Sequence, residues 1–276
     1  MKYREVLPPP PLASVVESLW EIRSEHPLDS PCVHRVLPDG CFDLVLHLGS
    51  MPSADRLDVG APTAGIAIVG VRLRAVRLEL VRDVHIVGAC VRPGGVRSLL
   101  DAPACELTDR VVALADLWGP RAASIEDEVR SGAPDDALDR LAASLVRRLR
   151  NPTLDTVSER AVALIRGASG ALAVDALADE LGVARRRLER RFAQNVGLTP
   201  KQFCRVVRFE GVVRRPRGRS WAERALVHGY HDQAHLVHEF RALAGVPPLA
   251  LERELGASGR SAGRVAIRQD GRGAAR

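Results

Sequence analysis

Residues 228–240, with the sequence HGYHDQAHLVHEF, contain four of the eight histidines in this 276-residue chain. On a helix, His231 and His235 would share a face, and they could chelate zinc together with Asp232 or a neighbouring histidine. The order of the residues disfavours this interpretation. Asp232 is a typical helix-capping residue, so His231 would precede the helix and the four-residue spacing need not bring the two rings together. The stretch also lacks the HExxH order of helical zinc sites.

The alternative is a helix whose polar face meets a partner. Gln233, His235 and His238 would face outward from such a helix. Leu236 and Phe240 would hold it to its own domain through an apolar stripe. The same helix is repeated earlier in the chain without any histidine, which excludes a structural metal shared by both copies.

The earlier copy, ARRRLERRF at residues 184–192, places five arginines within seven positions. Like charges this close on a helix repel one another, at a cost of roughly tenths of a kcal/mol per pair. A polyanion would remove that cost, because phosphate contacts release counterions and arginine can form two hydrogen bonds with guanine. A solvated charged face is the alternative interpretation. It would also have to explain the charge distribution and the helical pattern around this segment.

Charge is divided unevenly along the chain. Residues 155–276 carry 22 Lys+Arg against 13 Asp+Glu, whereas residues 1–154 carry 18 against 21. Lys2 and Lys201 are the only lysines, so nearly all of the positive charge is arginine, whose planar group matches phosphate and guanine edges. A bias toward arginine codons could explain that choice. It would not explain why the positive charge gathers in the C-terminal half.

The length predicts about two domains. No apolar run is long enough to span a membrane, and the N-terminus lacks the pattern of an export signal, so a cytoplasmic location is expected. Cysteines occur without CxxC spacing and are expected to be reduced and to fill the core. They are Cys32, Cys41, Cys90, Cys105 and Cys204.

The first 110 residues are predicted to form an antiparallel β-rich domain. Runs such as CFDLVLHL, AVRLELV and VHIVGACV are apolar or alternating, and turn residues separate them. Helical spacing begins at VRSLL and dominates residues 111–152, where Asn151-Pro152 is predicted to end it. A helical domain is predicted over residues 153–256. The final residues, 257–276, have little apolar content and are expected to be disordered.

The helical domain contains an internal duplication. Five positions recur 48 residues later: Leu188, Phe192, Gly197, Pro200 and Phe203 correspond to Leu236, Phe240, Gly245, Pro248 and Leu251. Each copy predicts a helix, a tight turn and a second helix, a unit that can lay its second helix in the major groove of DNA. A helix over about residues 200–213, opened by Thr199-Pro200, would join the two copies.

Two segments carry a family resemblance. LADELGVARRRLERRFAQNVGLTPKQFCRVVRFE and WAERALVHGYHDQAHLVHEFRALAGVPPLAL resemble the paired helix-turn-helix domain of AraC/XylS-family transcription regulators, over about residues 155–255. By this resemblance Arg186, Glu189 and Arg190 read bases, and Arg185 and Arg187 lie near phosphates. In the second copy the base-reading residues would be Gln233, Ala234 and His238. The complete set expected to bind DNA is Arg185, Arg186, Arg187, Glu189, Arg190, Lys201, Arg205, Gln233, Ala234, His235 and His238.

The N-terminal half, through HRVLPDGCFDLVLHLG, VRPGGVRSLL and LTDRVVALADLWG, is similar to an uncharacterised domain that often precedes AraC-type domains. The resemblance implies a cupin-like sensor with a helical dimerisation segment. Candidate effector-binding residues are polar groups of the β-rich region: His34, Arg35, Asp43, His47, His85 and Arg92. The same groups could instead be satisfied core and turn residues.

The sequence therefore predicts an α+β protein that regulates transcription by binding specific DNA sequences. Expected partners are double-stranded DNA, RNA polymerase, a small-molecule effector and a second copy of the chain, with no catalytic residue, metal, cofactor or membrane. One alternative is a metal-dependent cupin enzyme using His34, His47 and His85, although no strand carries a two-histidine-plus-carboxylate spacing. A DNA repair enzyme would need a cysteine in a Pro-Cys-His context, which the sequence lacks.

Overall fold

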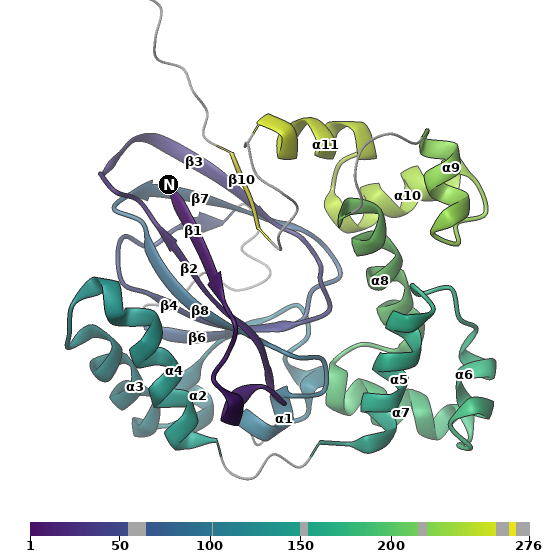
Figure 1. The fold of residues 1–276 in the computed structure, drawn as a ribbon, viewed down its shortest axis with the longest axis horizontal. Helices are drawn as coiled ribbons and strands as arrows, with labels where there is room; N and C mark the ends of the chain where they lie inside the picture. Colours follow the sequence, from purple (N-terminus) through teal and green to yellow (C-terminus); the bar gives the residue numbers. More distant parts are fainter. Residues whose placement is uncertain (55–64, 101, 150–153, 215–219, 258–264, 269–276) are drawn as a thin grey trace, which may run out of the picture.

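The structure is a computed structural model. It describes residues 1–54, 65–100, 102–149, 154–214, 220–257 and 265–268. Figure 1 shows a β-rich N-terminal part beside a helical C-terminal part, which confirms the predicted α+β architecture. Within the described residues, no helix combines the length and the apolar character needed to cross a bilayer.

The N-terminal part contains two sheets, and each pairing between their described strands is antiparallel. The larger sheet has the strand order β1 (Lys2–Val6), β2 (Val16–Arg23), β8 (His85–Val91), β4 (Phe42–His47), β6 (Ile66–Val69), β9 (Val111–Ala113). The smaller sheet has the order β10 (Val265–Arg268), β3 (Leu28–Val36), β7 (Val76–Arg82), β5 (Ser53–Ala54).

Strand β4 shows how the two faces of the larger sheet differ. Successive side chains of a strand point to opposite faces. Phe42 and Leu44 belong to the main core, which the sheet shares with the helices. Val45 joins a smaller core that also contains Ile22 of the same sheet and Leu80 of the other sheet. The space between the sheets is therefore filled by an apolar cluster.

Helices α2 (Leu114–Trp118), α3 (Pro120–Arg130) and α4 (Ala137–Arg148) pack against strands of the larger sheet. The other described helical elements of this part are η1 (Pro10–Leu12), α1 (Val96–Leu99), η3 (Ala104–Glu106) and η4 (Pro134–Asp136). Of these, α1 and η3 contact α7 (Arg185–Val196), and η4 contacts α4. A carboxylate links α3 to α4, because Glu128 accepts a hydrogen bond of 3.0 Å from Nη2 of Arg148. Hydrogen bonds from Arg148 and Ser144 lower the pKa of Glu128 to about 2.

The helical segment starts three residues later than predicted. Val111–Ala113, which was assigned to it, forms edge strand β9 beside β6. The β-branched pair Val111 and Val112 favours a strand, and the open edge of β6 provides backbone partners for it. The linker predicted at Asn151-Pro152 lies outside the described residues.

Among its described residues, the C-terminal part contains seven helices. They are α5 (Thr156–Gly167), α6 (Val174–Glu180), α7 (Arg185–Val196), α8 (Pro200–Arg214), α9 (Trp221–Val227), α10 (Gln233–Ala244) and α11 (Pro248–Ala257). Helix α8 belongs to two cores, since Phe203 is buried in the first and Phe209 in the second. The ring of Phe203 packs edge-on against Phe192 of α7, with 5.6 Å between the ring centroids. The ring of Phe209 packs in the same way against Phe240 of α10, at 4.8 Å. The predicted connecting helix therefore joins both repeats through aromatic packing.

The C-terminal tail differs in part from the prediction of disorder. Val265–Arg268 forms β10, which pairs with Val33–Val36 of β3. An edge strand such as β3 presents unpaired backbone groups. Hydrogen bonds to these groups can order a short segment even when its own preference for a strand is weak. The rest of the predicted tail, 258–264 and 269–276, lies outside the described residues.

Candidate nucleic-acid interface

The first helix-turn-helix unit consists of α6 and α7. Gly182 ends α6 with a φ of +64°, a left-handed conformation that glycine adopts without a Cβ clash. The amide of Val183 then donates to the carbonyl of Ala178 at 3.1 Å. This closed turn fixes the direction in which α7 leaves α6.

The second unit, α9 and α10, repeats this turn with one additional residue. Gly229 has a φ of +71°, and Tyr230 donates to Ala225 at 2.9 Å, as Val183 does in the first unit. Gly182 and Gly229 are 47 residues apart, whereas positions after the turn are 48 apart. The additional residue precedes Asp232, whose side chain caps α10 by accepting from the amide of His235 at 2.7 Å.

This cap also decides the arrangement of the histidines. The backbone amide of His231 donates to Nδ1 of His235 at 3.3 Å, and His231 itself lies outside α10, as Asp232 capping predicts. The hydrogen bond from the His235 amide holds the pKa of Asp232 below its usual value. In the described chain, the metal-ligating side chains that come together do not include these histidines.

Helix α7 exposes four of its five arginines, and the fifth, Arg191, is half-buried and pairs with Asp155. Arg186, Arg187 and Arg190 are exposed, and within the described residues no acidic group pairs with them. Arg185 differs, because it donates at 3.0 Å both to Asp175 of α6 and to Glu189 one turn later. Hydrogen bonds with these carboxylates raise the pKa of Arg185. The side of α7 is therefore strongly cationic, and one of its arginines is held in place.

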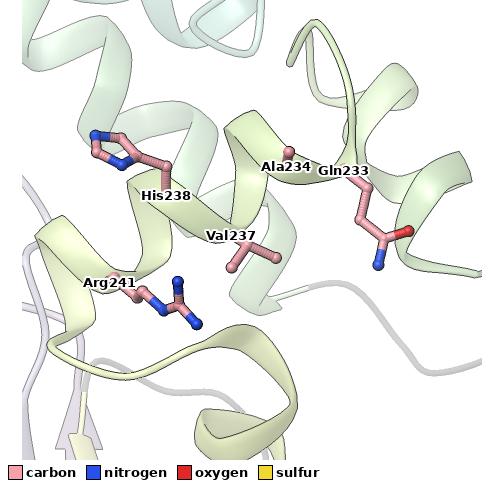
Figure 2. Close-up of a pocket in the computed structure, with 5 residues that line it drawn as sticks. All are labelled: Gln233, Ala234, Val237, His238 and Arg241. Atoms are coloured by element: carbon pink, nitrogen blue, oxygen red, sulfur yellow. The ribbon is translucent and has the colours of Figure 1, made fainter.

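Helix α10 carries the matching stripe (Figure 2). A shallow surface hollow is lined by Gln233, Ala234, Val237, His238 and Arg241 on one side of the helix. At a separation of 48 residues these positions correspond to Arg185, Arg186, Glu189, Arg190 and Ala193 of α7. The predicted residues of the two helices thus occupy equivalent faces.

The sequence analysis missed two members of the α10 stripe. Val237 is the counterpart of Glu189, and Arg241 extends the stripe by one turn. Applying the 48-residue separation to every predicted position of α7 would have identified Val237. Arg241 had no such signal, because its counterpart is Ala193.

Two further predicted residues lie on α8. Lys201 is exposed at the start of the helix. Arg205 is half-buried and forms two hydrogen bonds with Glu239 of α10, at 2.8 and 3.0 Å. The Glu239 side chain is only 9% exposed, and its hydrogen bonds raise the pKa of Arg205. This ion pair fixes α10 against α8.

The end of α7 is packed against the N-terminal domain. Gly197 has a φ of +84°, and a Cβ there would lie 2.8 Å from Val71 and 2.9 Å from Phe42. The hydroxyl of Thr108 donates to the Gly197 carbonyl at 2.6 Å. The main apolar core continues through this contact, since it contains residues of both domains.

The end of α10 meets the N-terminal domain at the equivalent turn. Arg35 of β3 donates to the carbonyl of Ala244 at 2.8 Å and pairs with Glu254 of α11 at 2.9 Å. The amide of Ala75 donates to the carbonyl of Leu243 at 2.7 Å. A Cβ added at Gly245, which corresponds to Gly197, would lie 3.7 Å from Nη1 of Arg35. The N-terminal domain therefore contacts both repeats at the same point of the motif.

The six predicted effector residues do not converge on one site. By strand alternation, His34, Asp43 and His47 point between the two sheets, on the side of Cys32 and Val45. The remaining three lie elsewhere. Arg35 reaches the helical domain, His85 pairs with Glu21 at 2.9 Å, and Arg92 donates to the carbonyl of Ala13 at 2.9 Å.

His47 is one of these groups, and its pKa is strongly lowered. Its side chain is buried, and its Nδ1 atom has no hydrogen-bond partner among the described residues. Burial, and then the positive charge of Arg130, lower the pKa of His47 to about 4. The ring is therefore neutral at physiological pH and lies between the sheets.

Family comparisons match two separate regions. Residues 4–113 match a family described as a domain of unknown function (DUF6597), and residues 177–254 match a family described as a helix-turn-helix domain. The second region covers the first helix-turn-helix unit from residue 177 onward and the whole of the second unit. No curated protein matches the chain.

Several solved structures are similar at low sequence identity. ToxT from Vibrio cholerae is 10% identical over 91% of this chain and 98% of that chain, with a TM-score of 0.46. ToxT from the same organism with bound unsaturated fatty acid is 12% identical over 86% and 93%, with a TM-score of 0.44. The AraC-like transcriptional activator CuxR is 14% identical over 69% and 72%, with a TM-score of 0.21.

Proposed function

We propose that α7 and α10 are the two recognition helices of this chain. The premise is that the chain is a DNA-binding transcription regulator of the AraC type with an N-terminal DUF6597 domain. The observation that carries this proposal is the pair of equivalent exposed stripes on the two helices. A helix-turn-helix unit presents such a stripe to the base edges of the major groove. Because α8 connects the units rigidly, both helices can contact one side of a duplex, about one helical turn (~34 Å) apart.

The two helices are proposed to contribute differently to binding. Helix α7 brings Arg186, Arg187 and Arg190, which have no acidic partner among the described residues and are available for phosphates and guanines. Helix α10 brings Gln233, Ala234 and His238, which carry little charge and suit hydrogen bonds or apolar contacts with bases. Most of the electrostatic affinity would therefore come from the first unit.

Arg205, which the sequence analysis assigned to DNA binding, is given a positioning role in this proposal. Its guanidinium is occupied by the buried Glu239 carboxylate, and a phosphate would have to compete with that pair. Lys201 and Arg187 remain the candidates for phosphate contacts because both side chains are exposed. Arg185, held by Asp175 and Glu189, would reach a phosphate only after exchanging a carboxylate partner.

An effector is proposed to act through the contacts between the domains. The N-terminal domain packs on Gly197 and hydrogen-bonds beside Gly245, so a shift in either contact would change the relative orientation of α7 and α10. A ligand changes such an equilibrium only if it binds the two arrangements with different affinity.

Two protein partners complete the proposal. A second copy is proposed to bind through α3 and α4, because Figure 1 places these helices on the side of the β-rich part away from the helix-turn-helix units. RNA polymerase is the partner through which a bound regulator would affect transcription. Analytical ultracentrifugation of the full chain, with α3 and α4 surface variants, tests the first of these contacts.

The decisive experiment maps the DNA bound by the full-length protein and then measures affinity for the recovered sequence and for random duplex over a range of salt concentrations. Arg190→Ala should weaken binding to the recovered sequence about 10- to 100-fold and relax one base position. Arg187→Ala should weaken binding to both duplexes equally and reduce the salt dependence by about one phosphate contact.

Asp29→Ala, an exposed change at the start of β3, provides the matched control and should leave both affinities unchanged. The proposal fails if the folded protein shows no salt-dependent binding to any duplex. The assignment of Arg190 fails if its loss weakens specific and random duplex alike.

A further inference from the structure

Three donor side chains that are far apart in the sequence meet inside the N-terminal domain. The sulfur atoms of Cys41 and Cys90 and a carboxylate oxygen of Glu17 all lie within 4.8 Å of one another. The sulfur of Cys41 is 3.7 Å from Oε2 of Glu17. Each donor comes from a different segment: Cys90 from β8, Cys41 from the loop before β4, and Glu17 from β2.

Glu17 reaches this cluster because β2 is irregular there. The pairing of β2 with β8 shifts register between Val16 and Ser18, which leaves Glu17 outside the regular ladder. A bulge of this kind redirects one side chain of a strand. It turns a carboxylate toward two buried thiols that a regular strand would have left without one.

Apolar packing alone does not account for this grouping. Cys90 is fully buried and Cys41 is 3% exposed, so the two thiols lie in the protein interior. A carboxylate beside them loses hydration, a cost that an alanine or valine at position 17 would avoid. The Glu17 side chain remains 26% exposed, which leaves a path from solvent to the cluster.

We propose that Glu17, Cys41 and Cys90 form a binding site for one thiophilic divalent cation of the zinc type. Zinc prefers cysteine sulfur at about 2.3 Å and carboxylate oxygen at about 2.0–2.2 Å in tetrahedral geometry, which places the sulfur and oxygen ligands about 3.5 Å apart. The 3.7 Å separation between Cys41 and Glu17 is close to this value. A water molecule or an external ligand would complete the fourth position.

The surrounding charges fit a cation in this position. Binding releases the two thiol protons to solvent, so the dipositive ion is held by two thiolates and one carboxylate, with a net charge of −1. Arg166 of α5, whose Nη2 lies 3.5 Å from Oε2 of Glu17, would balance that charge. Asp39, which accepts from the Cys41 amide at 2.9 Å, adds to the negative potential around the site.

The same carboxylate connects the site to the helical domain. Glu17 is a proposed ligand and also the partner of Arg166, which lies in the helix that packs against α7. A cation that takes one oxygen of Glu17 changes the strength and direction of this ion pair. The cation would therefore be an effector of the regulator, an extension that rests on the proposed function, whereas the site itself does not.

Cobalt(II) titration of the reduced full-length protein tests the site directly. One equivalent of cobalt should bind with a sulfur-to-cobalt charge-transfer band and a tetrahedral visible spectrum, and zinc should displace it. Cys41→Ser and Cys90→Ser should each weaken binding by more than the roughly 10- to 100-fold that loss of an outer-shell partner costs. Cys105→Ser, which removes an exposed thiol elsewhere, should bind cobalt as the unmodified protein does.

Folding is checked by measuring DNA affinity of each variant without metal, which should equal that of the unmodified protein. A protein that shows no charge-transfer band overturns the site. So does a Cys41→Ser variant that is folded and retains the spectrum. Neither result affects DNA binding by the metal-free protein, so failure of the site and failure of the proposed function are distinguishable.

The connection to α5 has a separate readout. Zinc should change the DNA affinity of the unmodified protein by at least about fivefold, the lower end of ordinary allosteric coupling. Arg166→Gln should still bind cobalt with the same spectrum but should lose most of this zinc response. Equal zinc responses in Arg166→Gln and in the unmodified protein would overturn the role of the Glu17–Arg166 pair.

Discussion

The first helix-turn-helix unit exposes Arg185, Arg186 and Arg190 on α7, whereas the second exposes Gln233, Ala234 and His238 at the matching positions of α10. Their attachment to the N-terminal domain differs as well. The end of α7 packs into the main apolar core at Gly197, whereas the end of α10 shares a second apolar cluster with Leu37 and also accepts polar contacts from Arg35.

This difference teaches how a duplicated motif can divide its tasks. A close-packed apolar contact responds to changes of a few tenths of an ångström, because it has no space to absorb them. A Cβ added at Gly197 would lie within 3 Å of Val71 and Phe42, whereas one added at Gly245 would lie 3.7 Å from the Arg35 guanidinium. The contact at the end of the first unit is therefore the more tightly packed of the two.

The largest expected effect on DNA affinity comes from removing the positive charge that distinguishes the first unit from the second. Replacing Arg186, Arg187 and Arg190 together by alanine should lower affinity for the bound sequence by roughly 100- to 1,000-fold and flatten its salt dependence. Replacing Gln233, His235 and His238 together should cost about tenfold and leave the salt dependence unchanged. Fluorescence anisotropy at several salt concentrations measures both, and equal losses would remove the proposed division of roles.

The second prediction compares the two equivalent glycines. Gly197→Ala and Gly245→Ala each place a Cβ in left-handed backbone, which costs about 1 kcal/mol. Only Gly197→Ala also forces the new Cβ against Phe42 and Val71, and overpacking of this kind costs about 1–3 kcal/mol more. Thermal unfolding should therefore show a larger decrease in midpoint for Gly197→Ala, and equal decreases would contradict the tight packing of the first unit.

The third prediction separates positioning from DNA contact. Arg205→Ala leaves the Glu239 carboxylate buried without its guanidinium and should lower the free energy of unfolding by about 1–3 kcal/mol. Arg190→Ala, on the exposed side of α7, should leave stability unchanged while weakening DNA binding. Urea unfolding of both variants checks this contrast. Unchanged stability for Arg205→Ala would contradict the positioning role and favour a direct DNA contact for this residue.

The fourth prediction concerns pH and the N-terminal domain. The pKa of His47 is lowered from 6.5 to about 4, so the unfolded chain binds this proton more readily than the folded one. Its stabilising contribution is therefore complete above pH 6.5 and is lost as the pH falls toward 4. Between pH 7 and pH 5 this single group should lower the free energy of unfolding by about 2 kcal/mol.

Urea unfolding of the unmodified protein and of His47→Leu at the two pH values measures this contribution. The variant should lose about 2 kcal/mol less than the unmodified protein on going to pH 5. A matched change at the exposed His26, His26→Ala, should leave the pH dependence as it is. An unchanged pH dependence in His47→Leu would show that the ring is not held neutral between the sheets.

Much of the candidate interface could be predicted from local sequence. The repeated Leu-x3-Phe spacing, the capping residue Asp232 and the turn glycines depend on contacts within a few residues, and these define the helices and their buried sides. The exposed side of α7 followed directly from them. The counterpart Val237 was accessible through the duplication but required applying its spacing to every position.

Other features could not be read from the sequence because they depend on which distant side chains become neighbours. The Arg205–Glu239 pair joins residues 34 positions apart, and nothing in either local pattern distinguishes a buried partner from a phosphate contact. The predicted effector residues were chosen by type, and strand alternation then divided them between opposite faces of the sheets.

The sequence by itself determined a cationic, duplicated helix-turn-helix domain behind a β-rich one, because helix periodicity, turn glycines and net charge are local properties of the chain. Only the tertiary structure decided that Gly197 and Gly245 both meet the N-terminal domain, and that Glu17, Cys41 and Cys90 come together. These contacts arise from strand register and interdomain packing. Both are set by the burial of apolar surface across the whole fold and leave no periodic signal at the residues concerned.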